Sequence, residues 1–448
     1  MTEKRGSGGL FGRALRGGAL TAGAYVVAQG ARLAANLILA RLLFPEAFGV
    51  MALVTVFLVG LAMFSDVGIG PAISQNARGD DPAFLNTAWT VNVLRGALLW
   101  LLSCAVAWPL AQFYAAPDLA QLLPVAGLTL LIAGFNPTRI DTANRHLLLA
   151  RVTAFDLAAQ IIGIVAMVVL AWLLQSVWAL VIGAIVGALA KLALTWRFLP
   201  GEANRFRWEG EAARALIHFG KWIFASTACG FLLSQGDKAI FGAYLSLGEL
   251  GLYNIGYFLA SFPILLGGAV TGRILLPLYR DHPPAASVAN AARMARLRYG
   301  ISGGLLVLLG VMAWAGVPLV HLLYDDRYAA AGAVVVAVAC VQMVVVVGMT
   351  YDQSALAAGD ARGYFRLIAG KAVLQTVALL AGMHWGGLGG ALLAQGVALA
   401  LAHGLIVVLA RRHGAWDGRH DLVMGTGALM LAGLAIATHW QALVGLFA

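Results

Sequence analysis

Long runs of apolar residues, separated by short polar connections, dominate the pattern along the chain. An α-helix needs about 20 residues to cross the hydrocarbon core of a bilayer, and each run has roughly that length. The pattern therefore predicts thirteen candidate membrane spans. They cover residues 17–43, 46–73, 84–110, 117–135, 153–174, 177–199, 214–243, 246–272, 297–323, 328–350, 364–384, 386–410 and 421–447.

The composition supports this interpretation. Of the 448 residues, 61% are hydrophobic and only 11% are charged, and the mean hydropathy is +0.85. Soluble globular domains carry about 25% charged residues, so this chain has too few charges to cover several soluble surfaces. We expect an all-α polytopic membrane protein with about 13 transmembrane helices.

Basic residues predict the orientation of the chain. If the amino terminus is cytoplasmic, 25 of the 30 Lys and Arg residues lie on or beside cytoplasmic connections, and only 3 lie on the opposite side. Cytoplasmic loops are enriched in Lys and Arg, so this asymmetry predicts a cytoplasmic amino terminus. The net charge of +10 then reflects topology, and nothing indicates nucleic acid as a partner.

A weak internal repeat suggests two halves. Residues 42–49 resemble residues 244–251, and residues 151–157 resemble residues 361–367, although chance similarity is an alternative. Six spans per repeat would give both halves the same orientation, with substrate bound where they meet. We therefore expect six-helix bundles at residues 1–200 and 201–410, and an additional transmembrane helix at 411–448.

The first span carries a polar stripe. Tyr25, Gln29, Arg32 and Asn36 are spaced 4, 3 and 4 residues apart, which places them within about 60° of one helix face. A charge inside a membrane span is costly and marks a functional site by default. Arg32 therefore either lines a cavity or forms a buried structural network with neighbouring carbonyl groups.

Two other spans carry polar side chains. Arg95 lies inside the third span, where its long stem could also let the charge reach the cytoplasmic interface. In the seventh span, Ser234 and Lys238 share one face and Asp237 is adjacent. These three residues are candidates for substrate binding, but Asp237 and Lys238 could instead form an ion pair near the outer interface.

Motifs of enzymes and cofactor sites are absent from the sequence. A phosphate-binding loop of the form GxxxxGK[ST] does not occur: Gly220-Lys221 is preceded at the required position by Ala215. Cys104, Cys229 and Cys340 lie far apart in apolar segments, so neither a disulfide framework nor a metal site is predicted. We expect no catalytic residues, no cofactor and no bound metal.

Several short motifs resemble a known family. Residues 40–49 (ARLLFPEAFG) followed by 64–68 (FSDVG) are similar to the amino-terminal signature of polysaccharide exporters of the Wzx type. The resemblance continues over nearly the whole chain. Its later motifs are 236–238 (GDK), 249–254 (ELGLYN), 323–325 (LYD), 327–328 (RY) and 358–362 (AGDAR).

The resemblance implies the multidrug/oligosaccharidyl-lipid/polysaccharide flippase fold, with two six-helix bundles around a central cavity. It also implies a flippase that moves undecaprenyl-pyrophosphate-linked oligosaccharide from the cytoplasmic to the periplasmic leaflet of a bacterial inner membrane. Membrane lipid, this lipid-linked glycan and polysaccharide polymerase machinery would be its partners. Cavity arginines serve the anionic headgroup in related lipid II flippases, a role that Arg32 and Arg95 would take here.

Two alternatives stay open at this point. A multidrug antiporter of the same superfamily would share the fold but carry cations, which Arg32 and the shortage of mid-span carboxylates disfavour. A membrane glycosyltransferase or polymerase is the enzyme alternative. Such enzymes usually have a large periplasmic loop, whereas the predicted extracytoplasmic connections here are short.

Overall fold

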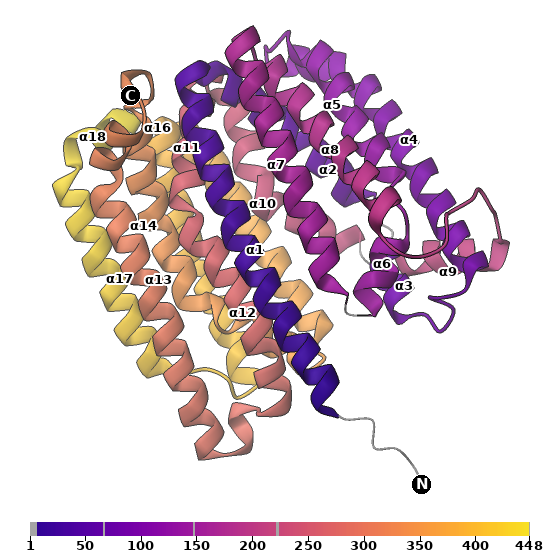
Figure 1. Cartoon of the computed structure of the whole chain (residues 1–448). Coiled ribbons are helices and arrows are strands. Elements are labelled where there is room, and N and C mark those ends of the chain that lie inside the picture. The colour runs from indigo at the N-terminus through magenta and orange to yellow at the C-terminus, as the bar shows by residue number, and fades with distance from the viewer. Residues whose placement is uncertain (1–6, 66–67, 147, 221–223, 448) are drawn as a thin grey trace. The chain divides into compact units, whose positions relative to one another are not determined.

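The computed structural model describes residues 7–65, 68–146, 148–220 and 224–447. Asp66 and Val67 of the 64–68 motif lie outside the described residues. Every regular element in the described ranges is an α-helix or a short 3-10 helix (Figure 1). The chain divides into two compact units, Met1–Thr227 and Ala228–Ala448.

The amino-terminal unit is built from nine helices in the part that the structure describes. In chain order they are α1 (Ser7–Leu42), α2 (Pro45–Phe64), α3 (Ile69–Gln75), α4 (Pro82–Phe113), α5 (Leu119–Gly134), α6 (Arg139–Arg145), α7 (Leu149–Leu174), α8 (Trp178–Phe198) and α9 (Gly210–Gly220). Within this unit α7 packs closely on α8, α4 on α5, and α1 on α7.

The carboxyl-terminal unit begins inside α10 (Phe224–Tyr244). It continues with α11 (Leu247–Ala260), α12 (Phe262–Asp281), α13 (Val288–Leu323), α14 (Ala331–Met349), α15 (Asp352–Ala357), α16 (Ala361–Arg412), α17 (Gly418–Thr438) and α18 (Trp440–Val444). Three 3-10 turns accompany them at Pro284–Ala286, Asp326–Tyr328 and Gly445–Phe447. The central helix is α14, which packs on α11, α13, α16 and α17.

The helices fit a membrane. Among the described residues, nine helices are long and apolar enough to cross a bilayer, or ten if the bent pair α5 and α6 forms one span. The expectation of a polytopic all-helical protein is therefore confirmed, while the number of thirteen spans stays a prediction. The predicted span 246–272 is broken at Ser261, because Pro263 lies in the first turn of α12 and cannot continue the hydrogen bonding of α11.

Two predicted spans, 364–384 and 386–410, are the two halves of α16. A straight helix of 52 residues would be about 78 Å long, more than twice the thickness of the hydrocarbon core. The chain instead bends at Gly386 and Gly387, and Gly387 has a φ of 56° that favours glycine. A Cβ atom on Gly382 would lie 2.4 Å from the carbonyl oxygen of Gly390, so the two halves pack backbone to backbone.

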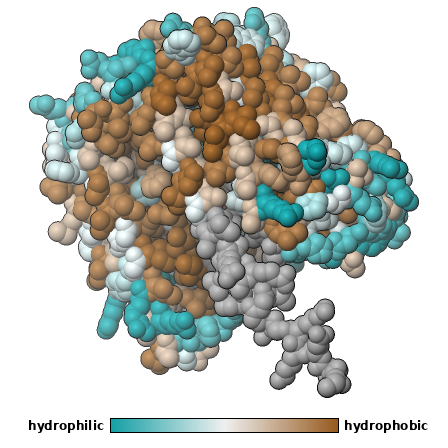
Figure 2. Space-filling model, viewed as in Figure 1, coloured by the Kyte–Doolittle hydropathy of each residue, from teal (hydrophilic) through white to brown (hydrophobic). Residues whose placement is uncertain are grey.

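Exposed tryptophans support the membrane assignment. Five of them, each between 61% and 83% exposed, lie towards the helix ends that the charge pattern places away from the cytoplasm. Tryptophan prefers the membrane–water interface, where its ring meets lipid and its N–H meets water. They are Trp108, Trp172, Trp314, Trp385 and Trp440. On the face shown in Figure 2, hydrophobic residues cover the helices and hydrophilic residues gather at their ends.

Side-chain caps fix several helix starts. Asp81 accepts a hydrogen bond from the backbone N–H of Ala83 in the first turn of α4. Asp360 does the same for Gly363 in α16, and Asp417 accepts from the N–H groups of Arg419 and His420 in the first turn of α17. Such caps satisfy backbone donors that have no partner within the helix. The cap at Asp417 also sets the position of the residues that follow it in α17.

Candidate functional site

The polar stripe of α1 lies against α7. Gln29 is buried and donates a hydrogen bond to the Tyr25 hydroxyl at 3.4 Å. Arg32 is exposed and reaches Oε1 of Gln160 in α7 at 3.5 Å. Gln160 in turn donates to the Ala28 carbonyl at 2.8 Å. The stripe is completed by Asn36, which is half-buried, so one edge of α1 carries polar groups and a cation.

Arg95 has a different environment. It donates to the Ala62 carbonyl at 2.7 Å and to the Ser65 hydroxyl at 3.0 Å. Both acceptors lie at the carboxyl end of α2, where the last carbonyl groups of a helix lack partners within the helix. Arg95 therefore ties α4 to the end of α2. A role in substrate binding stays a prediction for this residue.

The three candidates of α10 point in different directions. Asp237 is buried, and its Oδ2 accepts a hydrogen bond from the Tyr253 hydroxyl of α11 at 2.6 Å. The Lys238 ammonium lies 4.6 Å from the ring centroid of Tyr257, and Ser234 donates to a carbonyl of its own helix. No ion pair joins Asp237 to Lys238 in the described residues, because consecutive side chains on a helix diverge by about 100°.

A cavity of about 310 Å³ lies within the carboxyl-terminal unit. Its walls come from α10, α11, α12, α14, α15 and α16, and much of its surface is aliphatic. Seven polar or charged side chains line it besides Tyr257: Asp237, Gln342, Asp352, Lys371, Gln375, Gln395 and His403. Of the three α10 candidates, only Asp237 reaches this polar cavity.

Ion pairing and hydrogen bonds satisfy part of the polar lining. The Lys371 ammonium lies 3.1 Å from a carboxylate oxygen of Asp352, and Gln342 donates to the Ser261 hydroxyl at 2.7 Å. Two buried acceptors, Oδ1 of Asp237 and Oε1 of Gln342, have no hydrogen-bond partner among the described residues. Buried polar groups are nearly always hydrogen-bonded, so this cavity suits water or a polar ligand.

Sequence reasoning missed two ionisable residues of this cavity. Lys371 is one of the 25 basic residues counted on or beside cytoplasmic connections, although it lies inside the predicted span 364–384. His403 lies inside the span 386–410 and was not singled out. The rule that an ionisable residue within a span marks a functional site would have identified both.

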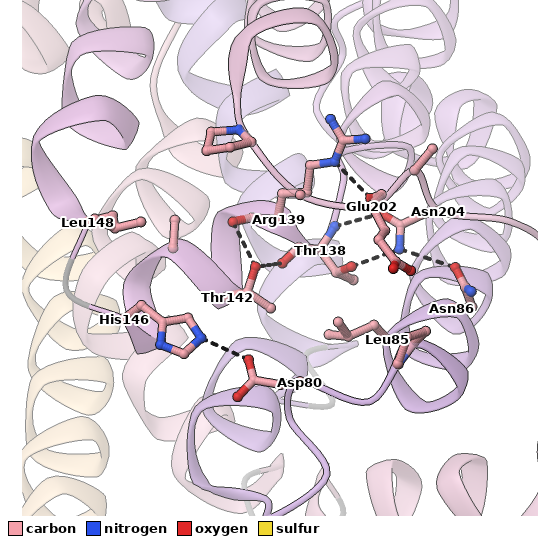
Figure 3. Close-up of a pocket in the computed structure, with 15 residues that line it drawn as sticks. Asp80, Leu85, Asn86, Thr138, Arg139, Thr142, His146, Leu148, Glu202 and Asn204 are labelled. Atoms are coloured by element: carbon pink, nitrogen blue, oxygen red, sulfur yellow. Dashed lines mark hydrogen bonds and ion pairs between the residues drawn. The ribbon is translucent and has the colours of Figure 1, made fainter.

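A second cavity, of about 390 Å³, lies at one end of the amino-terminal unit (Figure 3). Its lining comes from the connections around residues 80, 140 and 202, which the charge pattern places on the cytoplasmic side. Asn204 and Thr138 exchange two hydrogen bonds, at 2.8 and 3.0 Å. His146 contacts the Asp80 carboxylate at 2.9 Å. These polar groups mostly bond to one another. Their bonds therefore hold the connections together, and few of these groups are left to bind a ligand.

The connection between α8 and α9 is anchored by a cluster of charges. The guanidinium of Arg78 binds both carboxylate oxygens of Glu209, at 2.6 and 3.0 Å, and one oxygen of Asp81 at 2.6 Å. Its hydrogen bonds lower the pKa of both carboxyl groups, and a backbone N–H also contributes at Asp81. The two carboxylates raise the pKa of Arg78 in return.

The fold defines a class of protein. The structure is similar to that of the lipid II flippase MurJ in an inward closed conformation, with a TM-score of 0.68 and coverage of 95% of this chain and 99% of that chain. The sequence identity is 10%, so this likeness shows the fold alone. The chain is a multi-pass membrane protein with the helix arrangement of a solved lipid flippase.

Sequence comparison defines the family. The profile of a family described as "Polysaccharide biosynthesis protein" matches residues 38–328, and the chain belongs to this family. The resemblance that the 40–49 motif and the later motifs indicated is thereby confirmed.

Two curated relatives agree with this assignment. The succinoglycan biosynthesis transport protein ExoT of Rhizobium meliloti is 25% identical over 54% of this chain and 49% of its own length. The lipopolysaccharide biosynthesis protein WzxC of Escherichia coli is 22% identical over 60% of this chain and 54% of its own length. The matches therefore span about half the length of these relatives.

Proposed function

We propose that this protein is a flippase for lipid-linked polysaccharide units. It would move undecaprenyl-pyrophosphate-linked oligosaccharide from the cytoplasmic to the periplasmic leaflet by alternating access. The family match over residues 38–328 supports export of polysaccharide precursors, and the fold is one that a lipid flippase uses.

The observation that carries the proposal is the exposed guanidinium of Arg32 within the polar stripe of α1. Moving a bare pyrophosphate through about 30 Å of hydrocarbon is prohibitively costly, and a cationic, hydrated path removes most of that cost. Arginine suits this role because its planar fork binds phosphate oxygens in pairs and keeps its charge when partly buried.

The proposed binding residues are the eight polar candidates that the sequence singles out. Arg32 would hold the pyrophosphate, and Arg95 would supply a second positive charge. Polar contacts to the headgroup and the first sugars would come from Tyr25, Gln29, Asn36, Ser234, Asp237 and Lys238. The moving parts of this alternating access would be two six-helix bundles, 1–200 and 201–410, with 411–448 as an added helix.

The proposal includes a location. The basic asymmetry favours a cytoplasmic amino terminus, and the substrate class favours the bacterial inner membrane. A polysaccharide polymerase that receives the flipped unit would be its functional partner there.

Deletion of the gene in its host tests the proposal. Lipid-linked oligosaccharide should accumulate on the cytoplasmic leaflet and surface polysaccharide should fall, and a plasmid copy should restore both. The lipid-linked intermediates must be measured directly, because a redundant exporter would mask the loss of surface polysaccharide. Unchanged intermediates together with retention of a cationic dye would favour the multidrug antiporter instead.

A further inference from the structure

A network of hydrogen bonds in the carboxyl-terminal unit converges on one carboxylate. Oδ1 of Asp421 accepts from the Tyr351 hydroxyl at 2.7 Å and lies 3.2 Å from Nδ1 of His420. Oδ2 lies 3.1 Å from Nε2 of His403 and accepts from the Trp416 indole at 2.9 Å. Two imidazoles from different helices therefore share the Asp421 carboxylate.

The network is enclosed by helices. The His420 side chain is fully buried, and its Nε2 lies 3.1 Å from the Ser302 hydroxyl of α13. The side chains of Asp421 and His403 are 15% and 21% exposed. Carboxylate and imidazole charges interact strongly in such a poorly solvated place, because the effective dielectric constant is low.

Other charged and titratable groups border the network. The guanidinium of Arg298 lies 4.5 Å from the ring centroid of Tyr351 and donates to the Tyr279 hydroxyl. It forms no ion pair with Asp421 in the described part of the chain. On α16, the guanidinium of Arg411 lies 3.8 Å from the ring centroid of Trp416. Cys340 of α14 lines an apolar cavity together with His403 and Asp421. Further neighbours are Tyr299 on α13, Asp417 before α17, and Asp352, Lys371, Asp237 and Tyr257 around the polar cavity.

The arrangement accommodates one additional proton. With both imidazoles neutral, each can donate one N–H to Asp421, and the Ser302 hydroxyl can donate to Nε2 of His420. A proton added to Nδ1 of His403, which has no hydrogen-bond partner among the described residues, leaves both imidazole bonds to Asp421 in place. The imidazolium formed balances the carboxylate charge. A second proton would place two imidazolium groups beside the buried cation of Arg298, which opposes it.

His403 connects this network to the polar cavity. It lines the same cavity as Asp237, Asp352 and Lys371, and its Nε2 faces Asp421. Its Nδ1 has no hydrogen-bond partner among the described residues. His403 is thus the titratable group of the network that a proton from the polar cavity meets first.

We propose that His403, Asp421 and His420 form one proton-binding site, which is loaded from the polar cavity through His403. The ligand is a proton and not the glycan, so the proposal stands or falls independently of the proposed export. Because the site joins α16 and α17 to Tyr351, which lies between α14 and α15, its occupancy would alter contacts between these helices.

Proton counting on purified protein tests the proposal. Full-length protein in lipid nanodiscs is titrated between pH 5 and 8, the range in which histidine changes charge. We expect the double variant His403→Gln/His420→Gln to bind one proton fewer per chain than the wild type. A loss of two protons would show independent histidines, and no loss would show that the network does not titrate. Either result would overturn the shared site.

Trp416 provides a local readout, because its indole donates directly to Asp421. The fluorescence difference between wild type and Trp416→Phe should titrate together with the proton. This pH dependence of the fluorescence should be lost in His403→Gln, a single change at the edge of the polar cavity. It should be unchanged in His384→Gln, the control, because His384 is an exposed histidine of the same helix. An unaltered titration in His403→Gln would refute the route through His403.

Discussion

The hydroxyl of Tyr253 donates a hydrogen bond of 2.6 Å to Oδ2 of Asp237, and both side chains are buried. This bond joins α10 to α11 beside the polar cavity. The other oxygen of Asp237 has no partner among the described residues, so the tyrosine fixes the orientation of the carboxylate.

Tyr253→Phe should destabilise the protein, because it removes the donor and keeps the carboxylate buried. An unsatisfied buried polar group costs about 1–3 kcal/mol, and more if it is charged. Thermal unfolding of the purified protein should therefore begin at a lower temperature. Tyr244→Phe is the matched control, since Tyr244 is exposed. Equal shifts for the two variants would contradict the predicted role of the bond.

Arg32→Ala should nearly abolish export while the protein still reaches the membrane. Loss of a direct charged contact in a partly desolvated site costs on the order of 2–5 kcal/mol. Arg32→Lys keeps the charge but loses the planar fork, so partial activity is expected. Export and membrane abundance are measured together, and normal abundance with wild-type export in Arg32→Ala would refute the binding role.

Arg95→Ala should instead lower membrane abundance, because it removes the group that bonds to the end of α2. The comparison with Arg32→Ala separates a residue that holds helices together from one that contacts substrate. If Arg95→Ala is abundant but inactive, Arg95 is a second contact to the pyrophosphate.

Reporter fusions should confirm the orientation that the basic residues predict. Fusions after Ala115 and Trp385 should report the periplasm, and fusions after Pro200 and Pro284 should report the cytoplasm. A cytoplasmic signal after Trp385 would mean that the two halves of α16 do not each cross the membrane.

Gly382→Ala should destabilise the bend of α16. The new methyl group would meet the backbone of Gly390 and Ala391 within 2.5 Å, and forced overpacking costs about 1–3 kcal/mol. Gly404→Ala in the same helix meets nothing within 4 Å and should be neutral or stabilise by up to about 1 kcal/mol. The unfolding temperatures of the two variants, measured side by side, check this contrast.

The cluster of Arg78, Asp81 and Glu209 should make loop anchoring sensitive to acid. Both carboxyl groups have a lowered pKa in the folded state, so their contribution is complete above the unfolded values of about 4. It is lost as the pH falls through the lowered values. The stability difference between wild type and Arg78→Gln should therefore be present at pH 6 and shrink below pH 4. A difference that is independent of pH would show that the carboxylates do not contribute.

The sequence predicted the helices better than the site. The bend of α16 falls between the predicted spans 364–384 and 386–410, because hydropathy and paired glycines are local signals. Asp237 was also predicted as a candidate, since a charge within a span is conspicuous. The contact of His420 with Ser302, however, joins residues 118 positions apart. No periodicity within one helix encodes such a partner.

The three hydrogen-bonding contacts of the Tyr351 hydroxyl, with Asp417, His420 and Asp421, all come from α17 or its cap. A stop codon after His413 would preserve every helix through α16. The Tyr351 hydroxyl would then lose all three of these hydrogen-bonding contacts while still lying in an apolar bundle. Truncation at that position would therefore remove far more than a membrane anchor. Shortened versions prepared for expression should retain α17, and insertions between α16 and α17 should spare residues 416–421.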